Sequence, residues 1–173
     1  LPEKSGFEVC RELRDAGRRM PIIMLTARQD EFDKLHGFEM GADDYVTKPF
    51  SVNELMARLK AVLLRGQRQE AQGQRHAFGD CELDADARVL TKGGREISLT
   101  RTEFDLLAYF CEHEGKALSR EQLMNDVWGT HYFGTQRSLD SFVASLRSKI
   151  ENKPGKPRHI QTIHGVGYKF AKS

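Results

Sequence analysis

The chain has 173 residues, of which 39% are apolar and 30% are charged, a composition typical of a soluble globular protein with one large domain or two small ones. Its longest apolar run, PIIML at residues 21–25, is far shorter than the roughly 18 residues of a membrane helix, and its first residues do not resemble a signal peptide. We therefore expect a cytoplasmic protein without a membrane partner. Three cysteines without a CxxC pair and six histidines without metal-ligand spacing argue against a disulfide framework and against a zinc site.

The net charge of +2 is unevenly distributed along the chain. Residues 1–65 have a net charge of 0, residues 77–136 of −5 and residues 137–173 of +6. A basic C-terminal end on an otherwise neutral or acidic chain predicts a polyanionic partner at that end.

The first 65 residues alternate between helical and strand patterns. The last helix of this part begins with Ser51 as a plausible N-cap and Glu54 at the capping-box position. The order helix, strand, helix, strand, helix is half of a doubly wound α/β domain and is too small to bury its own core, so we expect part of the domain to precede this chain. The predicted elements are helices at 6–17, 30–42 and 51–65, and strands at 21–27 and 44–48.

A polar, glutamine-rich stretch without large aliphatic residues separates this part from the rest of the chain. Such a composition is typical of a linker between domains. We therefore predict domains at residues 1–65 and 77–173, joined by a linker at 66–76.

After the linker, short strands alternate with turn signals such as KGG at 92–94. Three helical patterns and a glycine-turn hairpin follow. Three helices followed by a β-hairpin describe an α+β winged helix-turn-helix domain. The predicted helices are 100–115, 119–129 and 137–152, and the hairpin is 159–171.

Two predicted strands of the first part end in residues suited to a phosphoryl group. In open α/β sheets ligands bind beyond the carboxyl ends of the strands, where Thr26 and Lys48 lie. Thr26 can donate a hydrogen bond and Lys48 supplies a positive charge, while Pro49 fixes the backbone and is a candidate for a cis peptide bond. A threonine or a lysine taken alone is more often a cap or a solvated side chain.

Taken together, these segments resemble two known domains. SGFEVCRELR, PIIMLTA, GADDYVTKPF and ELMARLKAVLLR are similar to the receiver domain of two-component response regulators. LTRTEFDLLAYF, SREQLMNDVWG, RSLDSFVASLRSKI and IQTIHGVGYKF are similar to the DNA-binding domain of the OmpR/PhoB family. The resemblance covers nearly the whole chain.

The receiver resemblance implies roles for several residues of the first part. Thr26 and Lys48 match the hydroxyl and lysine that contact the phosphoryl group, and Tyr45 matches the switch aromatic. The phosphorylated aspartate and the acidic pair that binds Mg²⁺ in a complete receiver lie upstream of Leu1-Pro2, so the resemblance implies no catalytic residue, metal or cofactor in this chain. The family's dimer interface matches Lys34, Asp43, Asp44, Glu54, Arg58 and Arg65.

The third helix of the second domain is predicted to read DNA. Its core face carries Leu139, Val143, Leu146 and Ile150, and its opposite face is small and polar, which allows a helix to settle in the major groove. His164 stands where the family often has arginine, and Lys169 on the hairpin is the expected minor-groove or phosphate contact. The remaining predicted DNA-binding residues on the helix are Arg137, Ser141, Ala144, Ser145, Arg147 and Ser148.

These observations predict a DNA-binding transcriptional regulator of a two-component phosphorelay, and no enzyme. Its expected partners are double-stranded DNA, a sensor histidine kinase, RNA polymerase and a second copy bound through the receiver. Two alternatives remain: a phosphoryl-transfer enzyme, and a protein-interaction module whose winged helix binds protein. Salt dependence separates DNA binding from protein binding, since binding to DNA weakens steeply as salt rises.

Overall fold

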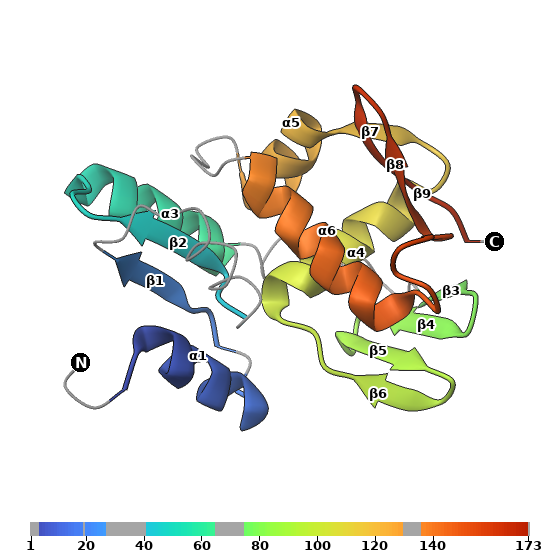
Figure 1. Ribbon diagram of the computed structural model, residues 1–173, viewed down its shortest axis with the longest axis horizontal. Helices are drawn as coiled ribbons and strands as arrows, with labels where there is room; N and C mark the ends of the chain where they lie inside the picture. The colour runs from blue at the N-terminus through green and yellow to red at the C-terminus, as the bar shows by residue number, and fades with distance from the viewer. Residues whose placement is uncertain (1–3, 19, 27–40, 65–74, 130–135, 173) are drawn as a thin grey trace.

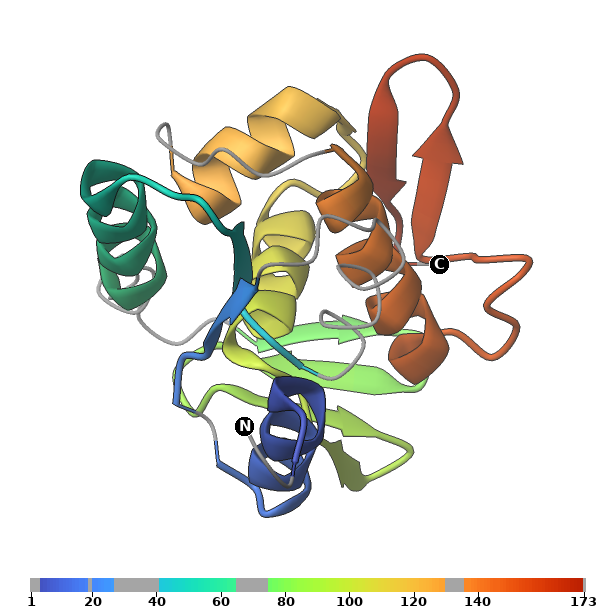
Figure 2. The same ribbon diagram turned by 60° about the vertical axis from the view of Figure 1, so that its left-hand side comes forward.

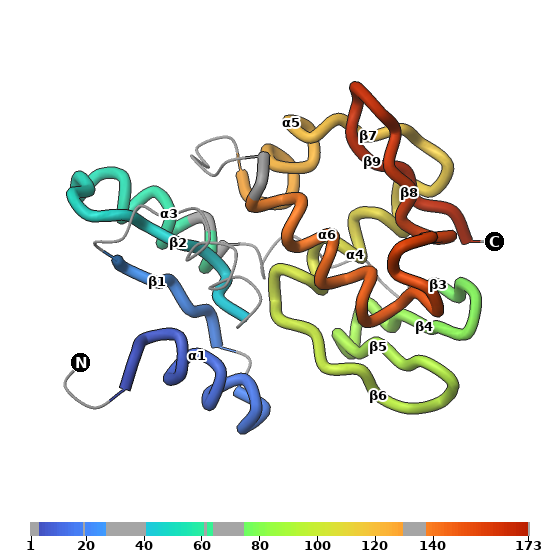
Figure 3. The backbone as a smooth tube through the Cα atoms, viewed as in Figure 1, coloured from blue at the N-terminus to red at the C-terminus, as the bar shows by residue number. Residues whose placement is uncertain are grey.

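The computed structural model describes residues 4–18, 20–26, 41–64, 75–129 and 136–172, without the side chains of residues 61, 64, 136 and 137. The helix predicted at 30–42 and nearly all of the predicted linker lie outside these residues. Figure 3 shows the trace from α1 to α3 on one side of the molecule and the trace from β3 to β9 on the other.

In its described residues, the N-terminal unit contains a two-stranded parallel sheet and two helices. Strands β1 (Ile23–Thr26) and β2 (Asp44–Thr47) pair with Ile23 opposite Asp44 and Thr26 opposite Thr47. Helix α1 (Gly6–Asp15) begins with a capping box between Ser5 and Glu8, a purely local signal that also fixes its start in the sequence.

Helix α3 (Val52–Leu64) begins as predicted, because Ser51 Oγ accepts a 3.0 Å hydrogen bond from Glu54 N. The apolar side chains of this helix lie on two sides that differ in burial. Val62 is buried, whereas Val52, Met56, Leu59 and Leu63 are exposed. A sheet of two strands covers only one side of the helix, so the other apolar side faces outward.

The C-terminal unit begins with a four-stranded antiparallel sheet whose strands follow chain order. Its first strand starts at Arg75, inside the predicted linker. Alternating burial along β4, with Cys81 and Leu83 inside, fits a sheet with one covered face. The strands are β3 (Arg75–Phe78), β4 (Cys81–Asp84), β5 (Val89–Lys92) and β6 (Arg95–Ile97).

Two long helices, α4 (Arg101–Glu112) and α6 (Gln136–Ile150), form the centre of this unit. Thr100 is the N-cap of α4 and makes a capping box with Glu103. The predicted core face of α6 is confirmed, because Leu139, Val143, Leu146 and Ile150 are all at most 1% exposed.

The middle helix differs from the prediction. Ser119 caps it as expected, but only α5 (Arg120–Leu123) is α-helical, and the chain continues as the π-helical segment η2 (Met124–Trp128) up to Gly129. The spacing of apolar residues does not reveal the change from an α-helix to a π-helix, because buried side chains occur in both segments, Leu123 in α5 and Trp128 in η2.

The predicted hairpin is present and belongs to a larger sheet. Strands β8 (Ile160–Ile163) and β9 (Gly167–Phe170) pair antiparallel, and β7 (Ala117–Ser119) adds to the free side of β9. Figure 2 shows this hairpin projecting beside α6. No helix among the described residues is long and apolar enough to cross a membrane.

Candidate functional site

The carboxyl ends of β1 and β2 lie side by side, as the sequence predicts for a phosphoryl-contacting edge. Thr26 pairs with Thr47, and Lys48 N donates a 2.6 Å hydrogen bond to Thr26 O. Thr26 is half-buried, Lys48 is exposed, and the Lys48–Pro49 peptide bond is cis. The structure therefore places Thr26 and Lys48 at the same edge of the sheet.

The predicted switch aromatic and three residues of the predicted dimer face make contacts within the chain. Tyr45 is 6% exposed and belongs to a buried apolar cluster that also contains residues of the C-terminal unit. Arg58 forms a buried ion pair with Asp44, at 3.2 Å, and a second with Glu54, at 3.0 Å. Three of the six residues predicted for the dimer face thus pair with one another. A fourth, Asp43, is also buried, and the other two, Lys34 and Arg65, lie outside the described residues.

Asp43 is fully buried where the two units meet. Its Oδ2 accepts hydrogen bonds of 2.8 Å from Arg14 Nη2 and from Ile22 N. Its Oδ1 accepts one of 2.9 Å from Thr102 Oγ1, on the first turn of α4. A buried carboxylate with these donors needs no further partner, and it ties the N-terminal unit to the helix that carries the C-terminal core.

The outward face of α6 contains some, but not all, of the residues predicted to read DNA. Ala144 and Ser148 are exposed and Ser141 is half-buried. Ser145 instead turns toward α4 and donates a 2.6 Å hydrogen bond to Glu103, whose other oxygen is bound by Lys149 at 2.6 Å. The physical reason is that Glu103, only 2% exposed, requires partners, and one helical turn of α6 supplies both.

Arg147 also differs from its predicted position on the flank of that face. Its guanidinium donates to Ile160 O at 2.6 and 2.9 Å and to Thr162 Oγ1 at 2.9 Å. Burial lowers the pKa of Arg147. These bonds commit the guanidinium to strand β8, so Arg147 joins helix and hairpin.

The hairpin presents the predicted His164 in an exposed turn and Lys169 half-buried on β9. Gly165, in this turn, has φ 74°, a conformation that favours glycine. Gly167 is required for a different reason: a Cβ on it would lie 2.3 Å from Leu118 O. Nothing is described for the side chain of Arg137.

The sequence analysis did not identify Asp140 and Arg120. Asp140 lies on α6 between Arg137 and Ala144, and its carboxylate is 43% exposed. It accepts hydrogen bonds from Arg120 and from Tyr168. A lone acidic residue on an otherwise small and basic helix face was the signal available in the sequence.

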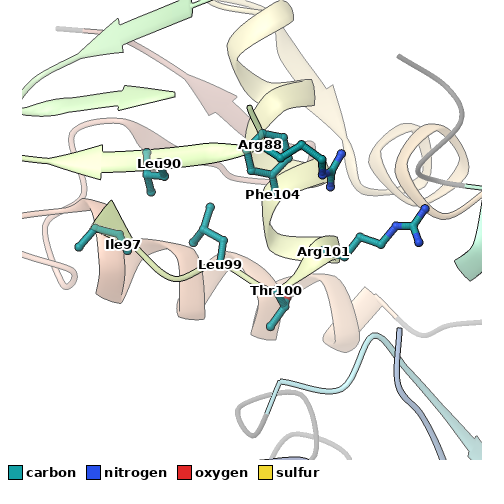
Figure 4. Close-up of a pocket in the computed structure, with 7 residues that line it drawn as sticks. All are labelled: Arg88, Leu90, Ile97, Leu99, Thr100, Arg101 and Phe104. Atoms are coloured by element: carbon teal, nitrogen blue, oxygen red, sulfur yellow. The ribbon is translucent and has the colours of Figure 1, made fainter. Parts of the chain in front are cut away.

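A cavity of about 320 Å³ opens beside the start of α4 (Figure 4). Leu90, Ile97 and Leu99 lie on one side of it, and the guanidinium groups of Arg88 and Arg101 lie together on the other. Both arginines have partners: Arg88 pairs with Asp105 at 2.6 Å, and Arg101 donates to Leu63 O at 3.0 Å. The cavity therefore marks the junction with α3 and contains no reactive group.

The described part of the chain contains no group of three or more histidine, cysteine, aspartate or glutamate side chains that could bind a metal ion. Asp43 and Asp44, the acidic pair nearest the sheet, lie at the amino end of β2 and are bound by arginines. These residues do not fit a magnesium site.

Comparison with known proteins agrees with this geometry. Residues 1–60 match the family model of the response regulator receiver domain, and residues 94–170 match that of the C-terminal domain of transcriptional regulatory proteins. The sensory transduction protein RegX3 of Mycolicibacterium smegmatis is 46% identical over 173 residues, covering 98% of this chain and 75% of the relative.

Two solved structures are similar to the chain. The response regulator DrrB, an OmpR/PhoB homologue from Thermotoga maritima, is 38% identical with a TM-score of 0.52, over 99% of this chain and 76% of DrrB. The DNA-binding domain of Klebsiella pneumoniae RstA, solved in complex with the RstA box, is 30% identical with a TM-score of 0.53, over 58% of this chain and all of the RstA domain. The chain therefore belongs to the OmpR/PhoB family of two-component response regulators, transcriptional regulators that combine a receiver with a winged-helix DNA-binding domain.

Proposed function

We propose that residues 77–173 bind promoter DNA through the outward face of α6 and the β8–β9 hairpin, and that residues 1–65, joined to them by residues 66–76, transmit the phosphorylation state of the receiver. The observation that carries the first part is the exposed small face of α6, with Ala144 and Ser148, beside a hairpin in a segment with net charge +6. Small side chains allow close approach to base edges, and the positive charge attracts phosphates.

In this proposal, the contacts divide by type. His164 and Lys169 on the hairpin bind phosphate or reach the minor groove. Ser141, Ala144 and Ser148 face base edges, with Arg137 on the same helix. Ser145 and Arg147 act indirectly, because Glu103 and β8 already bind them.

In this proposal, the phosphoryl group of the receiver acts at the carboxyl ends of β1 and β2. Thr26 and Lys48 would contact the phosphoaspartate of the receiver, whose phosphoryl group a sensor histidine kinase would supply. The hydroxyl would donate a hydrogen bond to the phosphoryl oxygens and the ammonium would offset their charge. A complete receiver uses Mg²⁺ for this transfer, and the described residues of this chain do not fit that ion.

Dimerisation through Asp43, Asp44, Glu54, Arg58, Lys34 and Arg65 would favour binding to paired DNA half-sites and recruitment of RNA polymerase. In the structure Asp43 contacts Thr102 of the DNA-binding unit. Use of Asp43 in a dimer therefore requires the two units to separate, so that docking and dimerisation compete.

Binding of the whole chain to labelled duplex DNA tests this proposal. Duplexes selected from a random library and scrambled duplexes are titrated between about 50 and 200 mM salt. Affinity should fall steeply with salt, and Lys169→Ala should reduce the salt slope by about one unit on both duplexes. Arg95→Ala is the matched control, since β6 lies at the other end of the unit from the hairpin turn (Figure 1), and it should leave the slope unchanged. Affinity that is independent of salt would contradict DNA binding.

A further inference from the structure

One carboxylate oxygen connects the three elements that surround the predicted DNA-binding face. Asp140 Oδ1, on α6, accepts a 2.6 Å hydrogen bond from Tyr168 Oη on β9. The same oxygen accepts a 3.1 Å hydrogen bond from Arg120 Nε at the start of α5. Recognition helix, hairpin and the preceding helix therefore meet at a single atom.

The tyrosine ring is also held on its faces. The guanidinium carbon of Arg120 lies 5.1 Å from the ring centroid of Tyr168, and that of Arg147 lies 5.5 Å from it. Both distances are within the range of cation–π attraction. Because Arg147 also donates to Ile160 O, the cluster includes β8, the other strand of the hairpin.

The tyrosine hydroxyl is a permanent donor. Burial raises the pKa of Tyr168 to about 12, and the hydrogen bond to Asp140 acts in the same direction. At neutral pH the hydroxyl therefore keeps its proton, and the charged acceptor makes the bond stronger than one between neutral groups.

The backbone next to the tyrosine has no room to move. Gly167 N–Cα lies so close to β7 that a Cβ would meet Leu118 O at 2.3 Å and Arg120 N at 3.0 Å. Arg120 N also approaches Val166 O at 3.4 Å. The hairpin is thus seated directly on the residues that begin α5, and Figures 1 and 2 both show it next to α5 and α6.

From this arrangement we propose that Asp140 is a positioning residue for DNA recognition. With Tyr168 and Arg120 it fixes the β8–β9 hairpin relative to α6, so that helix and hairpin reach the duplex in one arrangement. The inference rests on the proposed DNA-binding face and adds what sets its geometry. Pre-positioning of two binding elements raises affinity, because fewer arrangements are lost on binding.

The alternative role for Asp140 is direct contact with a base, since half-exposed carboxylates on a recognition helix accept hydrogen bonds from cytosine. Arg120 and Tyr168, which donate to Asp140, both belong to the protein, and both bind the same oxygen. An experiment can separate the two roles, because the substitution Tyr168→Phe removes the positioning hydrogen bond and leaves Asp140 in place.

Binding of the whole chain to its library-selected duplex is the first measurement. Tyr168→Phe should weaken binding about tenfold, the size expected for loss of one hydrogen bond to a charged group. Asp140→Ala should weaken it at least as much, because it removes the acceptor of both Tyr168 and Arg120. The double variant should be no weaker than Asp140→Ala alone, since Asp140→Ala already breaks the bond that Tyr168→Phe removes. The salt slope should stay unchanged, because no phosphate contact is lost.

Tyr109→Phe is the matched control. Tyr109 donates its hydroxyl to Asp126 elsewhere in the same unit, so this variant loses the same kind of bond away from the hairpin. It should bind DNA like the parent protein. If Tyr109→Phe weakens binding as much as Tyr168→Phe, loss of stability explains both and the positioning role is wrong.

A second measurement does not depend on DNA. Spin labels on Ala144→Cys and Val166→Cys report the distance between α6 and the hairpin turn, and the three native cysteines are buried. Tyr168→Phe should broaden this distance distribution and Tyr109→Phe should not. An unchanged distribution in Tyr168→Phe, or a shift in base preference in Asp140→Ala alone, overturns the proposal. If the parent protein fails to bind any duplex, the proposed DNA contacts are wrong, while the spin-label distances still decide the positioning role.

Discussion

Asp43 in the N-terminal unit and Thr102 in the DNA-binding unit are joined by a 2.9 Å hydrogen bond between buried groups. The same carboxylate holds Arg14 and the amide of Ile22, so the bond extends a network that begins in the receiver. Thr102 lies one residue before Glu103, which binds Ser145 and Lys149 of α6. Asp43 therefore contacts the first turn of α4, the same turn that binds α6 through Glu103.

Loss of the Thr102 hydroxyl should loosen the contact between the units. Thr102→Val keeps the shape of the side chain but leaves Asp43 with one donor fewer, at a cost of about 1–3 kcal/mol for a buried hydrogen bond. We expect a larger radius of gyration by small-angle X-ray scattering and faster hydrogen exchange of the first amides of α4. Thr91→Val is the control, because Thr91 makes only a 3.4 Å bond within its own sheet. An equal change in both variants would rule out a specific role for Thr102.

The Asp44–Arg58 pair should stabilise the N-terminal unit even in a monomer. Arg58→Glu leaves Asp44 buried without its cation and adds a like charge, so stability should fall by about 3–5 kcal/mol. Exchange of the two charges, as Asp44→Arg with Arg58→Glu, should restore part of the loss. Urea unfolding followed by circular dichroism measures this, with the exposed Lys60→Ala on the same helix as control. A full loss in the exchanged variant would mean that packing, not charge, holds the pair.

Stability should decline at alkaline pH. Burial raises the pKa of Cys111 to about 12 and of Cys81 to about 11, from ordinary values near 9. For a group whose pKa is higher in the folded than in the unfolded state, the free energy of unfolding does not depend on pH below the unfolded pKa. Between the unfolded and the folded pKa it falls as pH rises, by about 1.4 kcal/mol per pH unit for each group. Melting temperatures should therefore be flat from neutral pH to about 9 and fall above it. Cys111→Ala should reduce the slope of this fall, and an unaltered slope would show that the thiol is already accessible to solvent.

A side chain at Gly167 should displace the hairpin. In Gly167→Ala the new Cβ would overlap Leu118 O, a backbone atom that cannot rotate away, and overpacking of this kind costs about 1–3 kcal/mol. We expect a lower melting temperature together with weaker DNA binding. Gly155→Ala is the matched control, because nothing lies within 4 Å of its added Cβ. Equal behaviour of the two variants would mean that the hairpin moves without cost.

The sequence by itself determined the features that depend on neighbouring residues. The capping signal of Ser51 and Glu54 placed the start of α3, and their hydrogen bond confirms it. The spacing of Leu139, Val143 and Leu146 identified the buried face of α6, since a helix repeats every 3.6 residues and needs one apolar stripe. The motifs in their order identified the family.

Only the tertiary structure decided which partners the polar side chains bind and which of them are buried. Ser145 and Arg147 follow the period of α6, yet Glu103 and the carbonyl of Ile160, which are distant in sequence, hold both of them. Asp43, Asp44 and Arg58 have the charges of an exposed face and lie buried, because their partners come from other elements. Hydrogen bonds and ion pairs between distant segments depend on how the elements pack, and a local pattern in the sequence specifies which side chains are available but not which of them meet.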